Sequence, residues 1–229
     1  MNAPNRPIKL FGVPFSVHTR KVIIAARVKS VPLEIAPVAP VVPGSLPANW
    51  SSISPTGLIP AVDDGGYVLA DSTAILLYLE REFVEPALLP AGSREYGRAL
   101  FLDSWAGSAL FRSVVHPIFH NRIVNPKIRG QACDKSAVSH ALESAAPRAF
   151  EYLESLAPDA FLVGSRLSIA DLAILSNLIV LQYLGQRVDP AHHPKLSAYF
   201  RRHVTSPLFR DVLAREKPFA EKMGLSFEA

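Results

Sequence analysis

Residues 54–75 carry the strongest chemical signal of the chain, because they combine an unpaired strand edge with a helix start. Pro60 lacks a backbone N–H, so we expect something other than a neighbouring strand to face that backbone. Asp71 and Ser72 can cap a following helix, whose N-terminus supplies free N–H groups and positive potential. This arrangement suits an anionic ligand group, although a hairpin followed by a capped helix shows the same pattern without a ligand.

The elements that would hold these residues form a small mixed sheet with helices on both faces. Strands are predicted over residues 8–11, 33–36, the run that Ile59-Pro60 opens, and 67–70. The sequence Asp-Asp-Gly-Gly at 63–66 is typical of a hairpin turn. Ser16 can cap a helix over 17–28, with basic Arg20, Lys21 and Arg27 expected on the side away from the apolar residues, and a second helix is predicted over 72–83.

The rest of the chain is predicted to be helical. Residues 86–93 are rich in Pro and Gly and are interpreted as a linker between a domain over 1–85 and an all-helical domain over 94–229. Helices are expected over residues 94–115, 134–156, from Ser168 onwards, 194–203 and 207–217. His116-Pro117 is expected to kink or end the first of these, and Pro147 to bend the second. Ser168 and Asp171 have the spacing of a capping box.

Composition excludes several classes of function. A chain of 229 residues that is 49% hydrophobic can bury a core and is not disordered. The net charge of +4 is modest and its basic residues are scattered, so no nucleic-acid partner is expected. The longest apolar run, residues 169–181, is too short to span a bilayer and predicts a buried helix. With no secretory leader visible, these features predict a cytoplasmic protein without a membrane partner.

The cysteine and histidine residues do not indicate a metal site. Cys133 is the single cysteine, which excludes an internal disulfide framework and a cysteine zinc site. His192 and His193 have Asp189 as their one nearby carboxylate, which favours a loop before a helix. We therefore expect no metal cofactor.

Three motifs in order resemble the glutathione transferase family. Residues 10–22 (LFGVPFSVHTRKV) resemble the first strand and helix of that family, closest to its serine-type phi and theta classes. The stretch around Pro60 resembles the family's proline-flanked strand, with Asp71-Ser72 at its acidic-Ser pair, and residues 161–171 resemble its helical-domain capping motif. The resemblance covers residues 7–217. It implies a thioredoxin-like α/β domain joined to an all-α domain, a homodimer, and attack of glutathione thiolate on a small hydrophobic electrophile.

The resemblance assigns roles to individual positions. Ser16 matches the serine that hydrogen-bonds the glutathione sulfur, while Ile59 and a cis Pro60 match the edge that pairs with the cysteinyl part. Asp71 and Ser72 match the pair that holds the γ-glutamyl end. A free thiol has a pKa of about 8.5, and lowering it by about two units requires roughly 2.7 kcal/mol of preferential thiolate stabilisation. A serine hydroxyl at a helix N-terminus can supply much of this, whereas its simpler role is an N-cap. The neighbouring His18 and Thr19 are expected on the helix surface.

The chain departs from the family where the rest of glutathione would bind. Positions that carry basic or polar groups in phi-type enzymes fall near Ser45, Leu46 and Leu58. A missing cation removes a charge-assisted contact of roughly 1.5–3 kcal/mol. This predicts weaker glutathione binding, a different thiol ligand, or compensation by another side chain.

The resemblance also locates an electrophile pocket between the 13–15 loop and the first long helix of the second domain. Its candidate residues are Val13, Phe15, Trp105, Ala109, Arg112 and Phe119. Asp103 could reach a partner subunit's ligand, but a solvated helix position is the expectation we favour. Two alternatives stay open, a non-catalytic binding or regulatory protein, and an isomerase, dehalogenase or peroxidase that uses glutathione. Disulfide exchange is disfavoured because no cysteine lies near Ser16.

Overall fold

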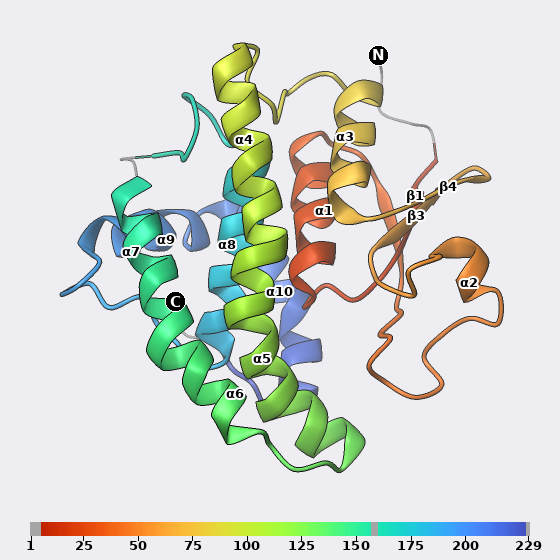
Figure 1. The fold of residues 1–229 in the computed structure, drawn as a ribbon. Helices are drawn as coiled ribbons and strands as arrows, with labels where there is room; N and C mark the ends of the chain where they lie inside the picture. The colour runs from red at the N-terminus through yellow and green to blue at the C-terminus, as the bar shows by residue number, and fades with distance from the viewer. Residues whose placement is uncertain (1–5, 157–159, 228–229) are drawn as a thin grey trace.

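A four-stranded mixed sheet forms the N-terminal part of the computed structural model, which describes residues 6–156 and 160–227 (Figure 1). Its strands are β1 (Ile8–Phe11), β2 (Leu33–Ala36), β3 (Ala61–Asp64) and β4 (Tyr67–Ala70), in the order β2-β1-β3-β4. β1 runs parallel to β2 and antiparallel to β3, and β3 and β4 form the predicted hairpin. The mixed sheet and the other three strand ranges are confirmed, whereas β3 begins at Ala61, after Ile59-Pro60, and includes Asp63 and Asp64 of the predicted turn.

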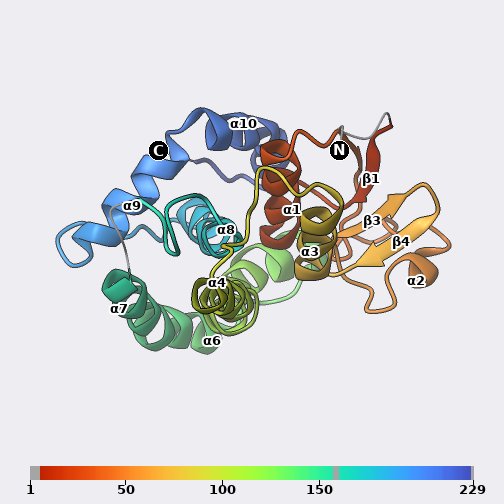
Figure 2. The same cartoon turned by 90° about the horizontal axis from the view of Figure 1, so that it is seen from above.

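Helices cover both faces of this sheet, as predicted. α1 (Val17–Val28) and α3 (Ser72–Glu82) lie on the face toward the helical part, and α2 (Trp50–Ile53) lies on the other face (Figure 2). The strand alternation explains the division, because successive side chains point to opposite faces. Leu10 belongs to the main core, whereas the next residue, Phe11, packs on the Trp50 ring with centroids 6.1 Å apart.

The second part of the chain is helical. After α4 (Ser93–Trp105), the helix continues through η1 (Ala106–Val115), α5 (His116–Phe119) and η2 (His120–Arg129), where η marks π-type hydrogen bonding. The remaining helices are α6 (Lys135–His140), η3 (Ala141–Ala145), α7 (Ala146–Leu156), α8 (Ile169–Tyr183), α9 (Pro194–Val204) and α10 (Pro207–Lys222).

The first long helix does not end at Pro117, as one of the two expected outcomes had it, but continues past this residue. The hydrogen-bond register changes from π-type to α-type at His116, so Pro117 occupies the start of a new segment, where a missing N–H is tolerated. The helix stops instead at Gly130, whose φ of 63° is the left-handed conformation typical of a helix C-cap. The π-type segment η3 precedes Pro147 in the same way.

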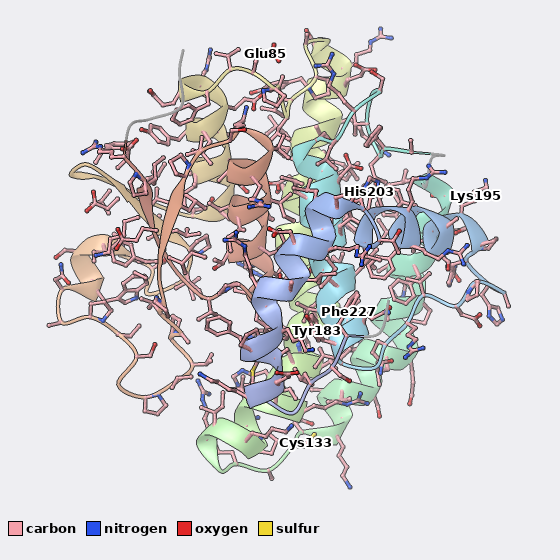
Figure 3. All side chains as sticks on the ribbon, turned by 180° about the vertical axis from the view of Figure 1, so that it is seen from behind. Glu85, Cys133, Tyr183, Lys195, His203 and Phe227 are labelled. Atoms are coloured by element: carbon pink, nitrogen blue, oxygen red, sulfur yellow. The ribbon has the colours of Figure 1, made fainter. Side chains whose placement is uncertain are left out.

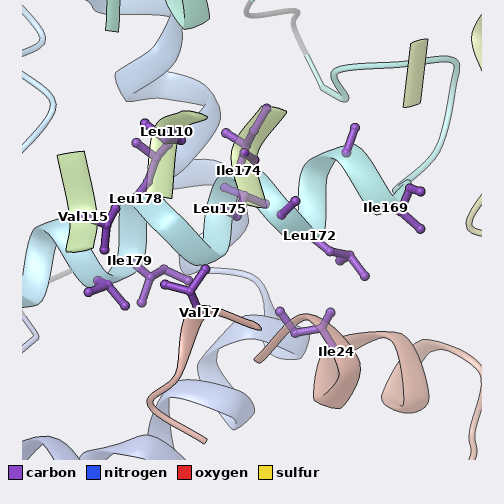
Figure 4. Packing of buried hydrophobic residues seen from close by; sticks show 14 of the residues in the cluster. Val17, Ile24, Leu110, Val115, Ile169, Leu172, Ile174, Leu175, Leu178 and Ile179 are labelled. Atoms are coloured by element: carbon purple, nitrogen blue, oxygen red, sulfur yellow. The ribbon is translucent and has the colours of Figure 1, made fainter. Parts of the chain in front are cut away.

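α8 forms the centre of the molecule, and 14 of its 15 residues are buried. Its start is the predicted capping box, in which Asp171 Oδ2 accepts hydrogen bonds from the Ser168 backbone N–H and hydroxyl. In the close view, Leu110 of η1 lies on one side of α8 and Val17 and Ile24 of α1 lie on the other (Figure 4). None of the helices in the described ranges is long and apolar enough to cross a membrane.

Candidate functional site

The sheet register brings three distant stretches of sequence to one end of the sheet. Phe11 pairs with Ala61, and Ala61 pairs with Ala70, so these residues form one row across β1, β3 and β4. β1 leaves this row toward Ser16, β3 enters it from Pro60, and β4 leaves it toward Asp71. Antiparallel pairing therefore places the three predicted glutathione-binding stretches side by side, although up to 55 residues separate them in the sequence.

Ser16 is the N-cap of α1, with extended backbone dihedral angles (φ −66°, ψ 131°). Its Oγ accepts a long hydrogen bond of 3.4 Å from the Thr19 backbone N–H. Because this bond uses the oxygen as an acceptor, the hydroxyl proton can still be donated to a ligand atom. The helix N-terminus adds positive potential at the same point.

The Ile59-Pro60 peptide bond is cis, as the family resemblance implied. Immediately before it, the Leu58 carbonyl accepts a 2.7 Å hydrogen bond from the Ser54 hydroxyl, which fixes the loop that leads into β3. The Leu58 side chain itself is 66% exposed, and Leu46 is 43% exposed. Ser45 turns its hydroxyl back to accept from the Ala39 N–H at 2.6 Å.

Asp71, rather than Ser72, is the N-cap of α3. Its Oδ1 accepts from the backbone N–H groups of Thr73 at 2.9 Å and Ala74 at 3.0 Å, whereas Ser72 is the first helical residue and is buried. Asp71 has φ 81° and ψ 126°, a conformation that costs a non-glycine residue about 1–3 kcal/mol. The strained turn holds one carboxylate oxygen against the helix and leaves the other available to a cationic group.

Two of the three basic residues expected on the side of α1 away from its apolar residues, Arg20 and Lys21, are buried. The Arg20 side chain is fully buried and pairs with Glu216 of α10, with Nε–Oε1 2.5 Å and Nη2–Oε2 2.7 Å. Lys21 is also buried and lies 2.6 Å from Asp103 Oδ1, while the Thr73 hydroxyl donates to Asp103 Oδ2 at 2.6 Å. Asp103 is therefore not a solvated residue. Both ion pairs connect α1 to the helical part of the chain.

The expected surface positions of His18 and Thr19 are also corrected. Thr19 is fully buried. Its hydroxyl oxygen lies so close to Gly12 that a Cβ on that residue would be only 2.6 Å from it. His18 is half-buried against η1, with its ring 4.7 Å from that of Phe111. Burial and the charge of Lys21 lower the pKa of His18 to about 4, although Asp71 and Asp103 oppose the shift. His18 is consequently neutral at pH 7.

The predicted electrophile-pocket residues fall into two groups. Phe15 is buried, and its ring lies 5.9 Å from that of Phe119 and 5.0 Å from that of Tyr183. Seen from behind, Tyr183 lies beside Phe227 near the C-terminus, with ring centroids 5.1 Å apart (Figure 3). Through Phe15, the loop that carries half-buried Val13 and Ser16 packs against this aromatic group.

Trp105 and Ala109 line a different cavity, a groove of about 560 Å³ between α4–η1 and α6–α7. The Trp105 ring packs edge-on against Tyr152 at 5.0 Å, and Phe101, His140 and Arg148 also line the groove. Val13, Phe15 and exposed Arg112 are not among its lining residues. The structure thus separates the predicted pocket residues, because the helix presents Trp105 and Ala109 on another face from Phe119.

The histidine pair His192-His193 and the single cysteine, Cys133, do not form a metal site among the residues that the structure describes. Asp189 Oδ2 lies 2.7 Å from His192 Nδ1 in an exposed turn, and no group of three or more His, Cys, Asp or Glu residues among those described could hold a metal ion. Cys133 is half-buried in the loop before α6, at the far end of the molecule from β1 (Figure 3).

Comparison with known proteins agrees with this geometry. Residues 10–87 match the family model of the glutathione S-transferase N-terminal domain, and residues 110–207 match that of the C-terminal domain. Glutathione S-transferase 3 of Zea mays is 27% identical over 215 residues, 91% of this chain and 94% of the maize protein. Human glutathione S-transferase theta-1 is 27% identical, covering 93% of this chain and 91% of the human protein.

The structure is also similar to that of FzlA from C. crescentus, with a TM-score of 0.81 and 26% identity over 91% of this chain and 92% of FzlA. The Caulobacter vibrioides relative named FtsZ-localized protein A is 26% identical over 178 residues, covering 76% of this chain and 77% of that protein. Both domain models, the relatives that span nearly the whole chain and the row of site residues lead to one conclusion: the chain belongs to the glutathione transferase family.

Proposed function

We propose that this protein conjugates reduced glutathione to small hydrophobic electrophiles. The observation that carries the proposal is the sheet row Phe11–Ala61–Ala70, which brings Ser16, Pro60 and Asp71 to one end of the sheet. A tripeptide thiol bound along this end would contact the hydroxyl of Ser16, the backbone of Ile59-Pro60 and the carboxylate of Asp71. Backbone pairing along Ile59-Pro60 would supply affinity in the way that a peptide adds to a sheet edge.

Ser16 would act by hydrogen-bonding the sulfur in its thiolate form. Its hydroxyl donates to the sulfur while its oxygen accepts from Thr19, so the residue needs neither to take a proton nor to form a bond. Together with the N-terminus of α1, this donor lowers the thiol pKa and raises the thiolate fraction at neutral pH. The thiolate then attacks the electrophilic carbon.

Asp71 and Ser72 would hold the γ-glutamyl end. The free oxygen of the Asp71 carboxylate can accept from the α-ammonium group, and the positive end of the α3 dipole at Ser72 would favour the α-carboxylate. The glycyl end would bind weakly, because exposed Leu46 and Leu58 stand where a cation or polar group is expected. We therefore infer a dissociation constant at the weak end of the micromolar to millimolar range.

We further propose a homodimer formed through the groove between α4–η1 and α6–α7. Phe101, which lines the groove together with the apolar residues Trp105, Leu110 and Val114, is 49% exposed. A large apolar side chain exposed in such a groove is a surface that a second copy of the chain would cover.

Calorimetric titration with reduced glutathione tests the proposal first, with thermal-shift measurement as a second readout. Micromolar to low-millimolar binding followed by turnover of an electrophile supports the transferase. Absence of both heat and thermal stabilisation at high glutathione concentration contradicts it.

A non-catalytic binding protein is the second candidate function. The exposed leucines Leu46 and Leu58 favour it, since they remove polar contacts to glutathione and present apolar surface instead. The similarity to a protein whose name places it with FtsZ adds support for this class. Glutathione binding without turnover of any electrophile, or no binding at all in a folded protein, would favour this candidate.

A further inference from the structure

We propose that the electrophile of this protein is an aromatic compound with an acidic substituent, which stacks on a row of rings and pairs with Arg129. The row consists of His18, Phe111, His116 and His120 and is called the ring row below. This inference rests on the proposed glutathione transferase function and names the substrate class that the same site takes.

The four rings follow one another in contact. His18 and Phe111 lie edge to face with centroids 4.7 Å apart, Phe111 and His116 are 5.8 Å apart, and His116 stacks on His120 at 5.1 Å with an interplanar angle of 24°. Offset stacks and edge-to-face contacts at these distances are favourable for planar rings. A flat aromatic ligand can extend the same arrangement.

The mixed hydrogen bonding of the long helix aligns the row. Phe111 and His116 are five residues apart at the end of the π-type segment η1, where residues at this spacing come into register. His120 follows four residues later, after the α-type turn α5. At the other end, the His18 ring lies beside Gly107, where a Cβ would be in ordinary van der Waals contact with His18 Cε1 at 3.7 Å.

The ring row lies beside Ser16. Phe15 precedes Ser16 and His18 follows two residues after it, and both contact the same helical stretch, Phe15 through Phe119 and His18 through Phe111. His116 lies on the helix between these two contacts and is exposed. A ligand stacked on His116 is therefore held close to the thiolate that Ser16 would stabilise.

The charge of this helix favours an acidic ligand. Between Asp103 and Asp134 the sequence holds no carboxylate but four cations, Arg112, Arg122, Lys127 and Arg129, so this stretch alone carries +4, equal to the net charge of the chain. Burial lowers the pKa of His116, and burial, His116 and Arg129 lower the pKa of His120, so both rings are neutral at neutral pH. At the His18 end of the row, Lys21 and the carboxylates of Asp71 and Asp103 act on the His18 ring in opposite directions.

Arg129 is the cation best placed to receive the acidic group. Its Nη1 lies 3.4 Å from His120 Nε2 at the end of the row, and its side chain is otherwise exposed. A guanidinium has five N–H donors in a planar fork that fits a carboxylate. Pairing with Arg129 at the end of the row orients the ligand, with the acidic group toward Arg129 and the reacting carbon toward Ser16.

A matched pair of substrates tests the inference, a chloronitrobenzoate and the corresponding neutral chloronitrobenzamide. In each reaction a sulfur–carbon bond forms, the carbon–chlorine bond breaks, chloride leaves with the electron pair, and the thiol proton passes to solvent. The readout is the ratio of kcat/KM for the acid to that for the amide, divided by the ratio of the uncatalysed rates with glutathione. We expect the wild-type protein to prefer the acid.

Arg129→Met should reduce this preference about threefold to fivefold, the effect of one exposed ion pair, and high salt should reduce it in the wild-type protein. Arg122→Met is the matched control, because it removes an exposed charge from the same helix outside the ring row and should leave the preference unchanged.

The outcomes separate the two proposals. Turnover without preference for the acid, or a preference that Arg129→Met leaves intact, overturns the inference while the transferase function stands. Glutathione binding with no turnover of either substrate also overturns the inference. Failure to bind glutathione at all contradicts the proposed function, and the inference is rejected with it.

Discussion

Lys21 of α1 and Asp103 of α4 form a fully buried ion pair, with Lys21 Nζ 2.6 Å from Asp103 Oδ1. The Thr73 hydroxyl at the start of α3 donates to the other oxygen of the same carboxylate. One carboxylate thus links the two helices that begin at Ser16 and Asp71 to the long helix of the second part. The position of Ser16 relative to Asp71 therefore depends on a buried ion pair that solvent does not screen.

Removal of one partner should therefore be far worse than removal of both. Asp103→Ala leaves a buried ammonium group unpaired and should lower the free energy of unfolding by about 3–5 kcal/mol. The double variant Lys21→Met/Asp103→Leu replaces both charges by apolar groups of similar size and should recover most of that loss. Urea unfolding at pH 7 measures both values. Equal destabilisation by the single and double variants would contradict this account.

Ser16→Ala should decrease conjugation about tenfold or more and leave the fold intact. The alanine cannot donate to the sulfur, so the thiolate fraction at neutral pH decreases, while loss of the long N-cap bond costs only about 1 kcal/mol. Turnover with a neutral electrophile and circular dichroism are the two measurements. Ser16→Thr keeps the hydroxyl and should retain more activity than Ser16→Ala, and unchanged turnover in Ser16→Ala would assign the thiolate partner to another residue.

The sequence predicted the parts of this site that depend on local signals. Three of the four strand ranges, the start of α1 at Ser16 and the capping box of Ser168 and Asp171 each follow from residue types within a few positions of one another. The resemblance to the family supplied the roles that local signals do not determine.

The burial of Arg20 and Lys21 could not be predicted in this way, because their partners lie far along the chain. Glu216 is 196 residues from Arg20, and an isolated amphipathic pattern places both basic residues in solvent. Spacing also could not assign Trp105 to a groove and Phe119 to the Phe15 side, since the π-type segment between them changes the face that each residue presents. Clusters such as the ring row are visible only once α1 and η1 are packed together.

Asp71 combines a helix cap, a strained backbone and a proposed ligand contact, and two substitutions separate these roles. Asp71→Asn keeps the cap, whereas Asp71→Gly removes it but relieves the strain at φ 81°. Both should weaken glutathione binding about tenfold or more, because each removes the charge that faces the α-ammonium group. Calorimetry measures the affinity, and a pH titration of the bound thiol should show little change in its pKa. A large shift of that pKa with unchanged affinity would contradict the assignment to the γ-glutamyl end.

His18 makes stability depend on pH in a defined window. Its pKa is lowered in the folded protein from 6.5 to about 4, so the unfolded state binds more protons between these values. The stabilisation is present above pH 6.5 and is lost as the pH falls toward 4, by at most about 3 kcal/mol. His18→Phe keeps the ring contact with Phe111 and should show a smaller decrease in unfolding free energy from pH 7 to about 4.5. An identical decrease in the two proteins would show that other groups cause it.

Phe101 offers the sharpest test of the homodimer, because it is 49% exposed and lines the groove that a second copy would cover. Phe101→Glu places a charge in that apolar contact and should convert a dimer of 24.9 kDa chains into monomers with little change in fold. Light scattering coupled to size-exclusion chromatography measures the mass. Lys195→Glu on α9 is the control and should remain dimeric, because the Lys195 side chain is exposed and is not among the residues that line the groove. A wild-type protein that is monomeric at high concentration, or a Phe101→Glu variant that stays dimeric, would assign this groove to another role.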